Sequence, residues 1–139
     1  MDLLDECLTA LLSTENKCEI LSPTNGKFIY ESFFATYPFT RWGQIDWDKV
    51  KHEKPWGEID KIIPSLTKFG QNFNQEEVYI IWGDTNLPVL KCMLVDVLRH
   101  IDDITPLGMY ATWIYCPSNG WTIEFWHHGK ITLGFSNKR

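Results

Sequence analysis

The sequence has no excess of basic residues: 13 Lys and Arg stand against 18 Asp and Glu, giving a formal net charge of -5. Proteins that bind nucleic acid in general do so through a basic surface that neutralises phosphates, so the composition argues against direct nucleic-acid binding. An acidic domain is better suited to a basic protein partner, although the same charge also serves simply to keep an ordinary domain soluble.

Motifs for metal binding, secretion and membrane insertion are also missing. The four cysteines, Cys7, Cys18, Cys92 and Cys116, include no Cys-x-x-Cys pair, which argues against a zinc site. The start MDLLDECLTALL carries acids instead of Lys or Arg, unlike a secretory signal, and no apolar run approaches the roughly 20 residues that span a bilayer. We therefore expect four free thiols in a cytoplasmic protein without metal or cofactor, with Cys7 and Cys92 as small core hydrophobes.

The 139 residues, 44% of them hydrophobic, fit a single globular domain over residues 1–139. Apolar spacing predicts helices at 2–13, 58–69 and about 87–101. Strands are predicted at 17–21, 28–34 and 78–82. The last of these is a continuous apolar run, typical of a strand buried on both faces. Residues 22–26 (SPTNG) have the composition of a turn, and residues 84–86 that of a helix cap.

The C-terminal third predicts an antiparallel meander with strands at 109–116, 121–127 and 131–135. Pro117-Ser-Asn-Gly120 supplies a hairpin turn between the first two. In the second strand Trp121, Ile123 and Phe125 alternate with Thr122, Glu124 and Trp126, so the two sets lie on opposite faces. The expected fold class is therefore α+β, with a mainly antiparallel sheet and a C-terminal strand meander packed against about three helices.

Aromatic residues are abundant, with 7 Trp, 8 Phe and 5 Tyr, and three of the Trp lie in the irregular stretch 35–57. Acids and indoles alternate there, which predicts a recognition surface in which charges steer a basic partner and Trp rings anchor it. The predicted binding residues are Asp46, Trp47, Asp48, Glu53, Trp56, Glu58 and Asp60. In the alternative interpretation the Trp side chains fill the core and the acids are merely solvated.

Signatures of the common catalytic sites, including the nucleophile elbow and the P-loop, are absent. The remaining candidate for chemistry is Glu124 with His127 and His128, of which Glu124 and His128 lie on one face of a strand. Four residues of strand separate them by roughly 13 Å, which favours a solvated sheet face over an acid–base pair. A small enzyme using Glu124 and His128 stays open as an alternative, as does an adaptor subunit with a permanent Trp-rich interface.

Two consecutive stretches carry a family resemblance: VYIIWGDTNLPVLKCMLVDVLRHIDDI, followed by GMYATWIYCPSNGWTIEFWHHGKITLGF. In style and order they resemble the C-terminal half of bacterial immunity proteins from contact-dependent growth inhibition systems. The resemblance covers roughly the last sixty residues and carries over no individual site residue. It implies a cytoplasmic protein that neutralises one cognate toxin domain. Such toxins are frequently basic nucleases, which an acidic inhibitor would block by mimicking phosphate charge or by covering the active site.

Overall fold

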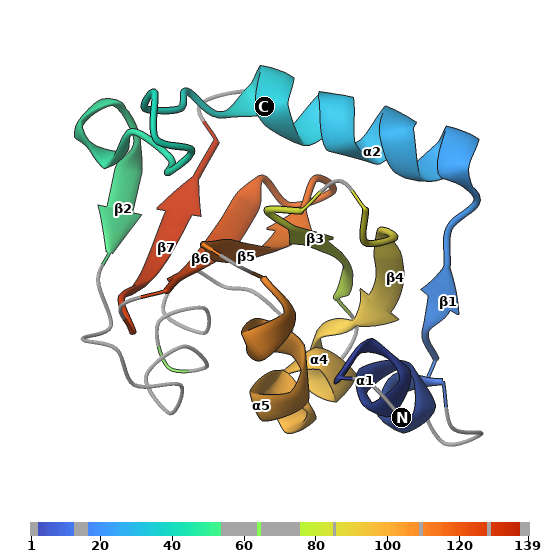
Figure 1. Ribbon diagram of the computed structural model, residues 1–139. Coiled ribbons are helices and arrows are strands. Elements are labelled where there is room, and N and C mark those ends of the chain that lie inside the picture. Colours follow the sequence, from blue (N-terminus) through green and yellow to red (C-terminus); the bar gives the residue numbers. More distant parts are fainter. Residues whose placement is uncertain are drawn as a thin grey trace.

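The computed structural model describes residues 3–12, 17–53, 64, 76–84, 86–108, 110–127 and 129–136. In this part of the chain a seven-stranded antiparallel sheet has the order β1-β4-β3-β5-β6-β7-β2 (Figure 1). The strands are β1 (Glu19–Ile20), β2 (Lys51–Glu53), β3 (Glu77–Trp82), β4 (Leu90–Met93), β5 (Ala111–Cys116), β6 (Trp121–Trp126) and β7 (Ile131–Phe135). The helices are α1 (Leu3–Leu11), α2 (Pro23–Thr36), α4 (Leu94–Arg99) and α5 (Ile101–Ile104), with short 3-10 turns η1 (Trp47–Lys49) and η4 (Thr105–Leu107). The predicted α+β class is confirmed.

The predicted C-terminal meander is also confirmed, because β5, β6 and β7 are neighbours joined by tight hairpins. Gly120 ends the first hairpin turn with φ +73°, a left-handed conformation that side chains with a Cβ adopt at a cost. Strand β3 lies between β4 and β5, as its unbroken apolar sequence predicted.

Helices cover both faces of the sheet (Figure 1). On one face α1, α4 and α5 pack against the alternate strand residues that include Trp121, Ile123 and Phe125. On the other face α2 and the chain that follows it cover Trp113 and Tyr115. The sheet is therefore a middle layer, and few positions of its central strands are solvated.

The cysteine predictions agree with the structure. Cys7 and Cys92 are buried in the core cluster beneath α1, and all four cysteines are free thiols. No helix among the described residues is long and apolar enough to cross a membrane. The predicted helix at 58–69 lies outside the described residues except for Pro64.

The predicted strand at 28–34 and the turn before it are wrong, because residues 23–36 form the longest described helix, α2. Ser22 begins this helix as its N-cap, with its hydroxyl oxygen accepting a hydrogen bond from the Asn25 backbone N–H at 3.2 Å. Pro23 occupies the first turn of α2. Proline is tolerated there because a backbone N–H at this position would have no partner within the helix. The residue types of a turn thus start a helix here.

The predicted helix at 87–101 is wrong in its first half. Residues 90–93 form β4, in which Leu90 and Cys92 are buried while Lys91 and Met93 are partly exposed. This alternation of period two is typical of a strand. The helix itself begins at Leu94, and Asp84 does not cap it; instead the Asp84 carboxylate accepts from the Asn86 backbone N–H at 2.9 Å.

Candidate functional site

Glu124 is the most unusual polar residue in the described part of the protein, because its carboxylate is buried at the centre of the sheet, with the residue 1% exposed. Its Oε2 accepts from the Ile45 backbone N–H at 2.9 Å and from the Trp113 indole N–H at 3.0 Å. Its Oε1 accepts from the Trp47 indole N–H at 2.9 Å. Three N–H donors thus replace the water that an exposed carboxylate would bind. We call Glu124 with Ile45, Trp47 and Trp113 the Glu124 cluster.

The Glu124 cluster joins distant parts of the sequence. Glu124 and Trp113 are cross-strand neighbours on β6 and β5, whereas Ile45 and Trp47 belong to the chain that leaves α2. The carboxylate therefore fixes the segment between α2 and β2 to the middle of the sheet. The expectation that this face is solvated is wrong, and the reason is the cover that α2 and this segment provide.

Trp47 does not present its ring to solvent: it is 9% exposed. Its six-membered ring lies against Gly134 on β7, where an added Cβ would overlap it. The ring of His52 packs on it at 5.6 Å between centroids. For this residue the structure agrees with the alternative that Trp fills the core. The toxin-binding role of its acidic neighbours stays a prediction.

The other predicted binding residues divide into two groups. Asp46 is partly exposed and pairs with Lys49 at 3.5 Å, and Asp48 is exposed. Glu53 ends β2, which is an edge strand. Trp56, Glu58 and Asp60 lie outside the described residues, so their placement relative to Asp46 and Asp48 stays a prediction.

An exposed indole that the sequence argument did not select lies close by in the chain. Trp42 is 64% exposed, and the guanidinium of Arg41 stacks over its ring at 4.7 Å. Both stand at the tip of a tight loop closed by the Phe39–Ile45 bridge, and we call residues 39–45 the Trp42 loop. Gly43 turns the chain there with φ +90°. The pair Trp42-Gly43 was the available signal, because such a glycine marks a turn and a turn exposes its neighbours.

The structure argues against the alternative in which Glu124 and His128 act as an acid–base pair, because the Glu124 carboxylate is not accessible. Both oxygens of Glu124 are occupied by N–H donors, and the residue is enclosed between β5, β6 and the segment after α2. His128 lies outside the described residues. Among the described residues there is also no group of three His, Cys, Asp or Glu side chains that could hold a metal ion. The arrangement around Glu124 is thus suited to holding the fold together.

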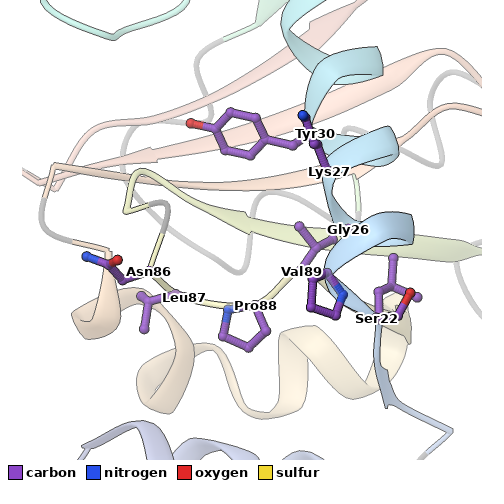
Figure 2. A pocket seen from close by; sticks show the side chains of 10 residues that line it. Ser22, Gly26, Lys27, Tyr30, Asn86, Leu87, Pro88 and Val89 are labelled. Carbon is purple, nitrogen blue, oxygen red and sulfur yellow. The ribbon is translucent and has the colours of Figure 1, made fainter.

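A pocket of about 390 Å³ opens between the N-terminal half of α2 and residues 86–89 (Figure 2). Lys27 and Tyr30 line it from the helix, and Leu87, Pro88 and Val89 line it from the opposite side. Most of its lining residues are apolar, and the Ser22 hydroxyl at its edge is engaged as the N-cap of α2. The pocket is therefore suited to apolar contact more than to a reaction.

Comparison with known proteins bears on the function of this scaffold. Residues 1–134 match the family model described as CdiI immunity protein EcoliA0-like. No curated protein matches the chain. The matched region contains β1 to β6, all of β7 except its last residue, and the whole Glu124 cluster. It therefore extends the resemblance from the C-terminal residues to nearly the full length. The chain therefore belongs to the CdiI immunity protein family and is a toxin-neutralising immunity protein.

Proposed function

We propose that this immunity protein works without catalysis, by binding a basic nuclease domain of its cognate toxin through the surface formed by the Trp42 loop and the acids that follow it. The observation that carries the proposal is the combination of an exposed Arg41–Trp42 pair with a rigid support beneath it. The support is the Glu124 cluster, which holds Ile45 at the end of this loop.

Preorganisation is the first argument for this surface. Thr40 and Gln44 are joined by a backbone hydrogen bond of 2.8 Å, and the Thr40 hydroxyl also donates to the Gln44 carbonyl at 3.1 Å. A loop held in this way loses little conformational entropy on binding, so more of the contact energy appears as affinity. Trp and Arg are also the residue types that most often dominate protein interfaces.

Charge is the second argument. Asp46 and Asp48 follow the Trp42 loop directly, and Glu53, Trp56, Glu58 and Asp60 continue the acidic and aromatic pattern in the sequence. Acids at the rim of an interface speed the approach of a basic partner. Lys49 neutralises part of the charge of Asp46. In this proposal Trp47 supports the surface from below while Trp42 supplies the anchoring ring.

The test measures the affinity of the protein for its cognate toxin domain. Trp42→Ala is compared with Phe28→Ala, a matched control because Phe28 is 72% exposed and lies on α2. We expect Trp42→Ala to weaken binding by about 30-fold or more, the size of an interface hot spot, and Phe28→Ala to leave it unchanged. Nuclease inhibition by the variants should follow the same order.

Charge reversal at Asp48 tests the electrostatic part separately. Asp48→Lys should slow association, and added salt should shrink the difference from wild type because it screens steering. If Phe28→Ala abolishes binding while Trp42→Ala and Asp48→Lys do not, the toxin binds over α2 and the proposed surface is wrong.

A further inference from the structure

Two cysteines stand opposite each other at the end of the β1–β4 ladder. Glu19 pairs with Lys91 and Ile20 with Leu90, so one further step of this antiparallel register places Cys18 opposite Cys92. Residues opposite each other in such a ladder project to the same face of the sheet. Both sulfurs therefore belong to the face covered by α1, where Cys18 packs against the core cluster that contains Cys92.

The ladder also determines whether Cys18 and Cys92 form a hydrogen-bonded or a non-hydrogen-bonded pair. The Leu21 backbone N–H donates to the Val89 carbonyl at 3.0 Å, which makes that pair hydrogen-bonded. Hydrogen-bonded and non-hydrogen-bonded pairs alternate, so Cys18 and Cys92 occupy a non-hydrogen-bonded position. At such a position the two Cα atoms lie about 4.5 Å apart, inside the range of about 4.4–6.8 Å that a disulfide bridges.

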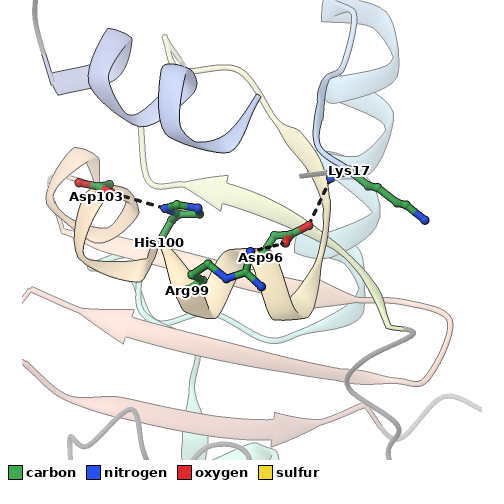
Figure 3. A network of polar contacts seen from close by, with 5 residues as sticks. All are labelled: Lys17, Asp96, Arg99, His100 and Asp103. Atoms are coloured by element: carbon green, nitrogen blue, oxygen red, sulfur yellow. Dashed lines mark hydrogen bonds and ion pairs between the residues drawn. The ribbon is translucent and has the colours of Figure 1, made fainter. Parts of the chain in front are cut away.

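The backbone beside Cys18 is held from a second direction (Figure 3). The Lys17 backbone N–H donates to Asp96 Oδ2 at 3.2 Å, and Asp96 is a buried residue of α4 that also pairs with Arg99 at 3.7 Å. Cys18 thus lies between the tether at Lys17 and the ladder that begins at Glu19. Bringing the two sulfurs together requires side-chain rotation and little backbone movement.

The two thiols have different environments. Cys18 is partly exposed and Cys92 is 1% exposed. The interaction of the Cys18 side chain with the Cys92 side chain lowers the pKa of the Cys18 thiol. The same interaction, together with burial, raises the pKa of Cys92. Cys18 is therefore the better nucleophile and the more accessible sulfur. Cys92 stays protonated beside it and is placed to react in a second step.

We propose that Cys18 and Cys92 form a peroxide-responsive dithiol pair that closes into a cross-strand disulfide. In the first step the Cys18 thiol gives up its proton, and the thiolate attacks one oxygen of hydrogen peroxide. The O–O bond breaks, Cys18 becomes a sulfenic acid, and the departing hydroxide takes up that proton and leaves as one water. In the second step the sulfur of Cys92 attacks the sulfur of Cys18; the hydroxyl departs with the Cys92 proton as a second water. Two thiols are oxidised and one peroxide is reduced, and a dithiol reductant reverses the bond by exchange.

The other two cysteines serve as internal controls. Burial raises the pKa of the Cys7 thiol to about 11, and burial likewise raises that of Cys116 to about 11. Cys116 is also engaged with Ser118 at 3.6 Å between sulfur and oxygen. Both remain thiols at neutral pH, so neither competes well for peroxide.

The experiment treats the full chain with hydrogen peroxide, and then maps its disulfides by mass spectrometry without reduction. We expect the titratable thiols to fall from four to two, a mass loss of about 2 Da on a monomer, a Cys18–Cys92 linked peptide, and full reversal by dithiothreitol. Cys7→Ser and Cys116→Ser should give the same linked peptide. Cys92→Ser should stop at a Cys18 sulfenic acid that dimedone traps.

Three outcomes overturn the proposal: four thiols that survive an excess of peroxide, a linkage that includes Cys7 or Cys116, or oxidation of Cys18 to the sulfinic acid in wild type without any disulfide. The wild-type map alone distinguishes these outcomes, so the test does not depend on how well the serine variants fold. It also requires no toxin, and its result is independent of the binding surface proposed above.

Discussion

The hydrogen bond between Trp47 and Glu124 offers the sharpest test of the Glu124 cluster. Trp47→Phe removes the indole N–H and keeps a ring against Gly134, while Glu124→Gln keeps the shape of the side chain and removes its charge. Each single change also alters packing or solvation, so neither alone measures the bond. A double-mutant cycle of the two substitutions cancels those other effects.

The expected coupling follows from the geometry. The N–H···O distance is 2.9 Å, the acceptor is a carboxylate, and both partners are buried. Hydrogen bonds to charged groups contribute about 1.5–3 kcal/mol to stability, so we expect a coupling free energy in that range. The free energy of unfolding of the four proteins, measured by urea denaturation, gives the value directly.

A matched control cycle combines Glu124→Gln with Trp82→Phe. The Trp82 indole N–H donates to the Ile104 carbonyl at 2.9 Å and shares no hydrogen-bond partner with Glu124. We expect these two substitutions to add within about 0.5 kcal/mol. If the Trp47 cycle is equally additive, the carboxylate does not hold Trp47 and the argument for a rigid support beneath the Trp42 loop fails.

Two further predictions concern stability. Gly134→Ala should lower the free energy of unfolding by about 1–3 kcal/mol, because the added methyl group overlaps the Trp47 ring; an unchanged thermal midpoint would show that the ring is not seated there. Ser22→Ala should cost about 1 kcal/mol through loss of the α2 N-cap, whereas Ser22→Asp should retain most of the stability. Equal losses in the two Ser22 variants in urea unfolding would rule out a capping role.

The sequence predicted the parts of the fold that local pattern determines. Alternation in Trp121–Phe125 and the Asn-Gly turn before it determine the hairpin, and the apolar run Val78–Trp82 determines the central strand. These signals need no knowledge of distant residues. The order of strands in the sheet does need it, since β1 and β2 pair with strands far along the chain.

Residues 23–36 show why other elements were missed. The segment carries Phe28, Ile29, Tyr30, Phe33 and Phe34, all of which also suit strands. Its helical face becomes evident only where Phe33 packs against Trp113 and Tyr115 at 5.2 and 5.1 Å between ring centroids. The Ser-Pro start was the local signal that would have favoured a helix.

The error at α2 also explains the error at Glu124. If residues 28–34 form a strand, no element covers the second face of the meander, and the Glu124 carboxylate is expected to be solvated. Burial of a polar residue depends on what packs over it, which alternation along one strand does not reveal. The Glu124 cluster is thus a consequence of tertiary packing between residues nearly eighty positions apart along the chain.

The strand order has a consequence for synthesis. Ribosomes deliver a chain from its N-terminus, yet β1 and β2 occupy the outer edges of the sheet and their partners, β4 and β7, are made later. Glu124 likewise emerges long after the Trp47 that it holds. A chain that stops before β7 leaves β2 without the strand that joins it to the rest of the sheet, so only chains translated through β7 can build the complete sheet.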